Sequence, residues 1–382
     1  VMVKDVNPGL VDTYPYPSNL TNVNGTLYFQ ADDGMNGMEL WKSDGTEAGT
    51  VMVKDVNPGS GNSNPSYLTN VNGTLFFLAS NLGLWKSDGT EVGTVLVNYL
   101  GFSSSTDLTN VNGMLYFVTI DGTNGAELWK SDGTAAGTVI VKDINPGTSN
   151  SNPSNLTNVN GTLYFSASNG TNGIELWKSD GTAAGTVMVK DINPGTSNSN
   201  PSNLTNVNGT LYFAASDGTN GTELWVSHGT ASDTYMLVNI NVTRSADASP
   251  SNLTNVNGTL YFVATNGTNG RELWKSDGTK AGTVMVKDIR SGSKSSSPSY
   301  LTNVNGTLLF HAYGDVNEIG LWRSDGTAAG TVYVKQVVLE GNTVNVNGTL
   351  YFSADDGMNG MELWKSDGTG AGTVMVTDIM WG

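Results

Sequence analysis

The sequence predicts an all-β fold, a single closed β-propeller of eight blades with four antiparallel strands each. Three observations support this class. A Leu-Trp pair, followed by Ser two positions after the Trp, recurs eight times at intervals of 42 to 49 residues. Short apolar runs alternate with turn-forming segments that account for many of the 48 glycines. No window has the periodicity of a useful amphipathic helix, which excludes helical repeat classes and leaves the propeller blade.

The fourth copy shows how one repeat divides into strands. We expect strand A near 155–159, strand B near 162–167, strand C near 174–178 and strand D near 186–192. Asn160-Gly161 joins A to B, and this pair favours a type I′ hairpin because both central residues need positive φ. Longer polar segments join B to C and D to the next A. One four-stranded meander with a crossover per repeat is typical of a propeller blade.

The same division applied to every copy sets the blade boundaries. The eight predicted blades cover residues 17–56, 66–100, 106–145, 154–193, 202–241, 251–290, 299–337 and 343–380. Residues 1–6 repeat the D-strand sequence found at 374–379, so nine D-type strands serve eight sets of A, B and C. We expect residues 1–6 to take part in ring closure. The surplus strand could pair with another molecule, because an unpaired edge is a template for association.

Composition excludes several partners and sites. The formal net charge of -16 argues against nucleic acid, whose phosphates require basic surfaces. No apolar run approaches the length of a membrane span, so membrane insertion is not expected. The absence of Cys excludes disulfides and Cys-based metal sites.

One segment of the repeat carries a family resemblance. Glu39-Leu40-Trp41-Lys42-Ser43-Asp44-Gly45-Thr46 resembles the signature of the ELWxxDGT repeat proteins of bacteria. Gly83 and Gly320 replace the Glu in two copies, and His228 replaces the Asp in another. The resemblance implies a propeller repeat and an extracellular or bacterial cell-surface location, without implying an activity. The Ser-Asp-Gly-Thr turn is also similar to the Asp-box of sialidase-like propellers, which implies a structural turn element.

Most repeated side chains have a structural interpretation. The eight Trp residues stand mid-strand beside Leu, and together with Tyr/Phe pairs such as Tyr164-Phe165 they indicate core positions. The Asp of the C–D turn, for example Asp180, is suited to bonding its own turn amides. We interpret Lys190-Asp191 in strand D as an outer-edge charge pair that discourages association through sheet edges.

The loops between strands B and C are the candidate ligand sites. Their carboxylate and amide oxygens on Gly-rich segments could hold Ca²⁺, although the spacing matches no EF-hand and turn formation alone also accounts for these residue types. The B–C loops share one blade edge with the variable D–A links, and loops on a rigid scaffold are where binding concentrates. The candidate residues are Asp33, Asn36, Glu39, Asp121, Asn124, Glu127, Asn172, Glu175, Asp217, Asn220, Glu223, Asn269, Glu272, Asp356, Asn359 and Glu362.

These observations favour a non-enzymatic, multivalent binding module for an extracellular glycan or surface polymer. Near-identical weak sites gain avidity when several engage one polymer. An alternative is a structural or assembly module of the cell surface that uses the surplus strand. A second alternative, a propeller glycoside hydrolase, requires one distinguished pair of carboxylates, whereas this sequence supplies carboxylates in repeated sets. The only histidines, His228 and His311, have no recognisable nucleophile partner.

Overall fold

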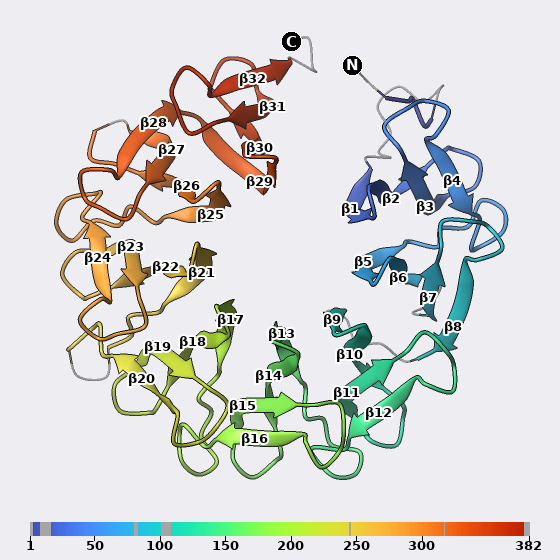
Figure 1. Cartoon of the computed structure of the whole chain (residues 1–382), viewed down its shortest axis with the longest axis horizontal. Coiled ribbons are helices and arrows are strands. Elements are labelled where there is room, and N and C mark those ends of the chain that lie inside the picture. Colours follow the sequence, from blue (N-terminus) through green and yellow to red (C-terminus); the bar gives the residue numbers. More distant parts are fainter. Residues whose placement is uncertain are drawn as a thin grey trace. The chain divides into compact units, whose positions relative to one another are not determined.

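The computed structural model describes residues 3–7, 17–79, 83–100, 108–243, 246–316 and 318–377. It confirms an all-β, eight-bladed β-propeller in which each blade is a four-stranded antiparallel sheet with its strands in chain order (Figure 1). Contacts divide the chain into unit 1 (Val1–Gly173 and Trp177–Met188) and unit 2 (Ile174–Leu176 and Val189–Gly382). Within the described ranges, no helix is long and apolar enough to cross a membrane.

Each blade runs from strand A to strand D, and the boundary between the units passes through blade 4. Blades 1 to 4 comprise β1 (Ser18–Val23), β2 (Thr26–Asp32), β3 (Met38–Ser43), β4 (Val51–Lys54); β5 (Ser66–Val71), β6 (Thr74–Ala79), β7 (Gly83–Ser87), β8 (Val95–Tyr99); β9 (Thr109–Val111), β10 (Met114–Ile120), β11 (Ala126–Ser131), β12 (Val139–Lys142); and β13 (Ser154–Val159), β14 (Thr162–Ser168), β15 (Ile174–Ser179), β16 (Val187–Lys190). Blades 5 to 8 comprise β17 (Ser202–Val207), β18 (Thr210–Ser216), β19 (Thr222–Ser227), β20 (Thr234–Val238); β21 (Ser251–Val256), β22 (Thr259–Thr265), β23 (Arg271–Ser276), β24 (Val284–Lys287); β25 (Ser299–Val304), β26 (Thr307–Tyr313), β27 (Ile319–Ser324), β28 (Val332–Gln336); and β29 (Val338–Val346), β30 (Thr349–Asp355), β31 (Met361–Ser366), β32 (Val374–Thr377).

The A–B turn has the expected hairpin geometry. Asn160 has a φ of 49° and Gly161 a φ of 86°, so both central residues are in the left-handed region that a type I′ turn requires. The Asn158 side chain accepts a hydrogen bond from the Gly161 amide at 2.9 Å, which closes the turn. The same arrangement recurs in the other blades and sets the A–B register.

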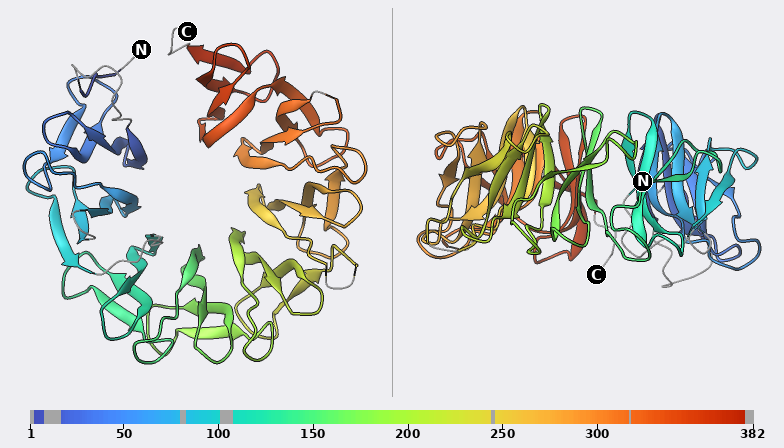
Figure 2. Two further views of the ribbon diagram at one scale, coloured as in Figure 1. Left: turned by 180° about the vertical axis from the view of Figure 1, so that it is seen from behind. Right: turned by 90° about the horizontal axis from the view of Figure 1, so that it is seen from below.

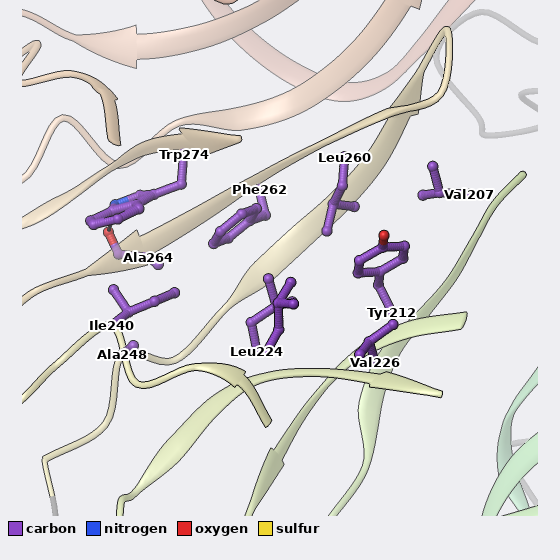
Figure 3. Packing of buried hydrophobic residues seen from close by; sticks show 11 residues of the cluster. Val207, Tyr212, Leu224, Val226, Ile240, Ala248, Leu260, Phe262, Ala264 and Trp274 are labelled. Carbon is purple, nitrogen blue, oxygen red and sulfur yellow. Dashed lines mark hydrogen bonds between the residues drawn. The ribbon is translucent and has the colours of Figure 1, made fainter. Parts of the chain in front are cut away.

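The core consists of apolar layers between consecutive blades of one unit. In unit 2, Tyr212 and Leu224 of blade 5 pack against Leu260, Phe262 and Trp274 of blade 6 (Figure 3). The eight repeated Trp side chains are between 3% and 9% exposed, which confirms their core position. Because each layer takes residues from two repeats, an isolated blade could not bury its apolar faces.

The C–D turn is stabilised by the side chains that the sequence suggested. In blade 4, Asp180 Oδ1 accepts hydrogen bonds from the Thr182 amide (2.8 Å) and hydroxyl (2.7 Å). The Ser179 and Thr186 hydroxyls are 2.7 Å apart and join the two strands beneath the turn. The turn Asp is therefore structural, as predicted.

The lysine of strand D has a different role from the one predicted. Lys190 Nζ donates to the Thr234 carbonyl of blade 5 at 2.6 Å and lies 5.9 Å from the centre of the Trp225 ring. Lys287 does the same to Thr331 and Trp322. The interpretation as a charge exposed at the outer edge was wrong, because in the five blades that have this lysine its ammonium group donates to a carbonyl of the next blade.

A chain of asparagine side chains also links successive blades. In six repeats one Asn uses Oδ1 to close its own A–B turn and Nδ2 to reach the backbone carbonyl of the equivalent Asn in the preceding blade. The Nδ2 to O pairs are Asn70–Asn22, Asn110–Asn70 and Asn158–Asn110 in unit 1, and Asn255–Asn206, Asn303–Asn255 and Asn345–Asn303 in unit 2, at 2.8 to 3.4 Å. We call this chain of contacts the asparagine ladder.

The N-terminal segment takes over the contacts of a D strand without being one. Val1 and Met2 lie outside the described residues, and residues 3–6 are not assigned to a strand. Lys4 Nζ nevertheless donates to the Thr50 carbonyl at 2.8 Å, as Lys190 does to Thr234. Val6 packs with Phe29, Ala31 and Trp41 of blade 1. The segment thus covers part of blade 1, and its role in ring closure stays a prediction.

Candidate functional site

Every blade has two edges of different character. Because the strands of each sheet follow chain order, the A–B and C–D turns lie at one edge, and the B–C loop and D–A link lie at the other. The right-hand view of Figure 2 shows strands running between these two edges within each blade. We call the edge with the B–C loop and the D–A link the loop edge.

The B–C loop is held by hydrogen bonds within itself. In blade 5, Asp217 Oδ1 accepts from the amides of Thr219 (2.9 Å) and Asn220 (2.8 Å), and Asp217 Oδ2 accepts from the Asn220 side chain at 2.7 Å. In blade 4 the first residue is Asn169, whose Oδ1 accepts from the Thr171 and Asn172 amides at 3.0 and 2.9 Å. Asp and Asn are therefore interchangeable here, because either one supplies the oxygen that closes the loop.

The structure brings the predicted Asp and Asn residues together in pairs on exposed loops. Burial opposes ionisation of Asp121, but hydrogen bonds from Asn124 and Thr123 outweigh it and lower the pKa of Asp121 to about 2. Burial also opposes ionisation of Asp33 and Asp217, but loop hydrogen bonds outweigh it and lower the pKa of both. Hydrogen bonds from the Asn359 and Met358 amides lower the pKa of Asp356. The Asn side chain donates to Oδ2 of its partner in Asp33–Asn36, Asp121–Asn124, Asp217–Asn220 and Asp356–Asn359, and the pairs Asn169–Asn172 and Asn266–Asn269 replace it in blades 4 and 6.

The predicted glutamates are placed elsewhere. Glu39, Glu127, Glu175, Glu223 and Glu272 are 0% exposed and Glu362 is 2% exposed, so none of these carboxylates is at the surface. Glu175 Oε2 accepts from the Ile192 amide (2.8 Å) and the Ser199 hydroxyl (2.6 Å), and Oε1 accepts from the Ser199 amide (3.1 Å). The Glu of strand C thus fixes the D–A link that follows it, whereas the Asp and Asn residues shape the loop.

The two repeats without this Glu also have different links. Gly83 in blade 2 and Gly320 in blade 7 replace it, and the segments that follow these blades lack the Pro that ends the other links (Pro65, Pro153, Pro201, Pro250 and Pro298). Gly320 lies beside the start of the link, since a Cβ on it would be 2.9 Å from the Val337 amide nitrogen. The buried Glu and a link that ends in Pro therefore occur together, because the Glu carboxylate binds the backbone of that link.

The D–A link packs beside the B–C loops. In blade 3 the Asn150 side chain accepts from the Ala126 amide at 2.8 Å, which joins the link to the end of the loop. Gly218 has a φ of 75°, and a Cβ there would lie 2.6 Å from Asn193 Oδ1 of the preceding link. Where the structure describes both, the B–C loops and the D–A links thus lie against one another along the loop edge of each unit.

The tips of the B–C loops are exposed Thr or Met residues. The residue after the first loop Gly is exposed in every loop of this kind: it is Thr123, Thr171, Thr219 and Thr268 in blades 3 to 6, and Met35 (74%) and Met358 (89%) in blades 1 and 8. The neighbouring link segment from Thr148 to Asn150 is exposed as well. The accessible chemistry of the loop edge in blades 3 to 6 is therefore mainly uncharged and polar.

A metal site or a catalytic site would need His, Asp or Glu side chains that lie close together. Among the residues that the structure describes, no three His, Asp or Glu side chains gather as metal ligands. His228 is exposed in a C–D turn, where its amide bonds the Asp233 carbonyl at 3.1 Å. His311 is 4% exposed in β26, and burial lowers its pKa. The two histidines lie on different blades, and each occupies a structural position.

Sequence reasoning missed a cavity of about 590 Å³ in unit 1 between β1 and β5. The cavity is lined by Asn19, Leu20, Thr21, Ser66, Tyr67 and Leu68. A signal was present in the repeat, because Tyr67 stands where most copies have Asn.

The buried glutamates make stability depend on pH. Burial raises the pKa of Glu223 and of Glu272 to about 7, and Glu223 lacks the Ser hydroxyl that Glu272 receives from Ser296. Because the folded state favours the protonated form, their contribution to stability is present below pH 4.5 and lost as pH rises through about 7. We expect the urea midpoint to fall between pH 5 and pH 8, and Glu272→Gln to flatten this slope. A midpoint that rises over this interval, or an unchanged slope in the variant, would contradict the assignment.

Comparisons with known proteins agree on the fold alone. No family profile matches the sequence, and no curated protein matches it. Among solved structures, the computationally designed Ika8 protein has a TM-score of 0.52 at 14% identity, with 92% of this chain and 96% of that chain covered. A puromycin hydrolase (TM-score 0.46, 12% identity) and a Mycobacterium tuberculosis puromycin-hydrolyzing peptidase (0.42, 11%) match 96% and 90% of this chain, which spans 55% and 59% of theirs. By its strand order and its similarity to the designed Ika8 protein, the chain is an eight-bladed β-propeller.

Proposed function

We propose that the chain is a non-enzymatic, multivalent binding module for a neutral extracellular glycan, which it contacts through the loop edge. One observation carries the proposal: several blades hold the same loop in the same hydrogen-bonded conformation and present an exposed side chain at its tip. A loop closed by its own bonds is ordered before it meets a ligand, so binding does not have to order it.

The chemistry of the tips suits a neutral polyol. Exposed threonines stand at the tips: Thr123 and Thr171 in unit 1, and Thr219 and Thr268 in unit 2. The hydroxyls of Thr123, Thr171 and Thr268 each donate to the first residue of their own loop and can still accept a hydrogen bond from a ligand. The acidic oxygens nearby already accept hydrogen bonds from the loop, as at Asp121 and Asp217. Hydroxyl and amide groups pair with sugar hydroxyls without the cost of removing water from a charge.

Repetition compensates for weak individual contacts. Each unit carries several such loops, so one polymer can engage several of them. Linked weak sites reach apparent affinities well above that of any single site. The resemblance of Glu39–Thr46 to the ELWxxDGT repeats supports an extracellular or cell-surface location for this activity.

Removing the tip hydroxyls should abolish retention on polysaccharide. We expect Thr123→Val with Thr171→Val to weaken binding, and the quadruple variant that adds Thr219→Val and Thr268→Val to lose roughly 100-fold or more in apparent affinity, because avidity is lost with each site. The measurement is retention on a panel of immobilised neutral polysaccharides, with release by free oligosaccharide, in Ca²⁺ and again in EDTA. Loss in EDTA would implicate a cation in the loops, and an EDTA-independent signal would exclude one.

The matched control is Ala184→Val on the opposite edge. Ala184 is exposed in a C–D turn, and Val92 occupies the same position of blade 2, where it is 88% exposed. This variant should bind like the wild type. Absence of wild-type retention on every polymer, or equal retention by the quadruple variant, would refute the proposal.

A second candidate function is assembly, and blade 8 provides its support. Within unit 2, Leu363 is 37% exposed and Val376 is 43% exposed, whereas the equivalent Leu273 and Val286 of blade 6 are 0% and 6% exposed under blade 7. A blade of the same repeat matches this face, and under the assembly hypothesis a second copy supplies that blade. Sedimentation velocity would then show concentration-dependent oligomers that Leu363→Lys removes and Val242→Lys, at an 82% exposed position, does not. A monomer at all concentrations would refute assembly.

A further inference from the structure

We propose that the cavity between β1 and β5 binds a single sugar ring of the polymer, with Tyr67 as the stacking surface. The inference rests on the proposed carbohydrate-binding function and adds to it a defined subsite outside the B–C loops. It concerns unit 1 alone, since all six lining residues belong to blades 1 and 2.

The cavity has the size and position of a ligand site. Its volume of about 590 Å³ lies within the usual range for small-molecule pockets. Ser18 at the start of β1 pairs with Gln30, and Ser66 at the start of β5 pairs with Leu78, close to the ends of strands β2 and β6. The lining residues therefore lie at the beginning of strand A, which adjoins the loop edge.

The lining combines an aromatic face with uncharged hydrogen-bonding groups. Tyr67 is 39% exposed and Leu20 is 60% exposed, so the cavity offers apolar surface to solvent. Asn19, Thr21 and Ser66 add amide and hydroxyl groups, and no Asp, Glu, Lys or Arg belongs to the lining. A sugar ring has an apolar face of C–H groups and a rim of hydroxyls, which match an aromatic ring beside polar side chains. The absence of charge from the lining favours a neutral sugar.

The two walls of the cavity are connected before any ligand binds. Asn19 Nδ2 donates to the Pro65 carbonyl at 3.1 Å, and Thr21 Oγ1 donates to the Leu68 carbonyl at 3.1 Å. These contacts join β1 to the start of β5 from both sides of Leu20. A cavity whose walls are already fixed loses little entropy on binding.

The backbone at Tyr67 gives independent support. Tyr67 has a φ of 54°, in the left-handed region that Asn tolerates better than an aromatic residue. The equivalent positions Asn155, Asn203 and Asn252 have φ values of 57°, 53° and 53°. A tyrosine placed there costs conformational energy, and at 39% exposure it recovers little by burial. Strained residues of this kind concentrate at functional sites.

Tyr300 in blade 7 provides an internal comparison. Tyr300 has a φ of 55° and follows Ser299 as Tyr67 follows Ser66, with Asn252-Leu253-Thr254 in the preceding blade matching Asn19-Leu20-Thr21. Tyr300, however, packs against the apolar cluster between blades 7 and 8. Its ring therefore has a packing role, which makes Tyr300→Asn the matched control for Tyr67→Asn.

The test measures binding of four soluble neutral hexasaccharides (cello-, manno-, malto- and chitohexaose) to the full chain by calorimetry. We expect at least one to bind the wild type, Tyr67→Asn to weaken its binding at least tenfold, and Tyr67→Phe and Tyr300→Asn to stay within threefold. Tyr67→Asn should keep or raise the melting temperature, because Asn suits the left-handed backbone. Retention of each variant on immobilised polysaccharide is measured in parallel.

The outcomes separate the subsite from the function. Tenfold weaker hexasaccharide binding in Tyr67→Asn alone supports the subsite. Equal binding by the wild type and Tyr67→Asn, with polysaccharide retention intact, overturns the subsite and leaves the loop-edge function standing. Retention of polysaccharide without binding of any hexasaccharide also overturns the subsite. Failure of the wild type in both assays overturns both proposals.

Discussion

Replacing Phe262 by alanine is expected to lower the free energy of unfolding of unit 2 by about 3–5 kcal/mol. Phe262 is 0% exposed, and its ring lies 6.4 Å from that of Trp274. Leu224, Ile240 and Tyr212 of blade 5 belong to the same cluster (Figure 3). The strands on both sides of the side chain are held by the backbone hydrogen bonds of their own sheets. The surrounding structure therefore cannot collapse into the space that the ring leaves. The loss is measured by urea denaturation followed by circular dichroism.

The control for this substitution is Val92→Ala at an 88% exposed position, which should change stability by less than about 0.5 kcal/mol. Hydrogen exchange adds a spatial test, because a repeat fold transmits stability mainly between neighbouring units. Protection should fall in β17 to β24 and persist in β5 to β8. Equal stability of Phe262→Ala and the wild type would mean that the layer between blades 5 and 6 is not close-packed.

Glu175→Ala is expected to cost about 1–3 kcal/mol, because it leaves the buried Ile192 amide without an acceptor, while the Ser199 amide keeps its bond to the Ile174 carbonyl at 3.0 Å. The Ile192 and Ser199 amides both donate to the Glu175 carboxylate, and the Ser199 hydroxyl is its third donor. The loss should be local. Amide exchange at Ile192 and Ser199 should accelerate together, since one carboxylate holds both ends of the link between blades 4 and 5.

Two variants distinguish this role from a general effect of removing a charge. Glu175→Gln keeps one acceptor oxygen and should lie between the wild type and Glu175→Ala in stability. Glu47→Ala removes an exposed Glu from a C–D turn and should be neutral within about 0.5 kcal/mol. If Glu175→Ala and Glu47→Ala were equally stable, the buried carboxylate would not be what fixes the link.

The strands and core were predictable because each carries a local signal that repeats eight times. Asn160-Gly161 specified a type I′ turn, and φ values of 49° and 86° confirm it. The Trp of strand C indicated a buried layer, and Trp177, for example, is 5% exposed. Strand D was placed at 186–192, but β16 ends at Lys190, because Ile192 turns away to donate its amide to Glu175.

The contacts between distant residues were not predictable from local patterns. Lys190 looked like an exposed edge charge, because nothing near it in sequence shows that the Thr234 carbonyl lies 2.6 Å from its Nζ. Glu175 adjoins the B–C loop in sequence, yet its buried carboxylate bonds the amides of the D–A link while Asn172 stays on the loop. The Tyr67 cavity depends on two strands 46 residues apart, whose approach only the structure supplies.

The asparagine ladder bears on how such a chain can lengthen or shorten over generations. Each rung joins the Nδ2 of one repeat to a backbone carbonyl of the repeat before it, as Asn255 does to Asn206. A repeat between two rungs, such as that of Asn70 or Asn255, therefore brings one donor and one acceptor of the same kind. If recombination between similar coding segments removed or duplicated one whole repeat, the new neighbours would meet with the same pair of groups. Copy number could then change in a single genetic event with no compensating mutation at the junction, so natural selection can act on the number of blades itself.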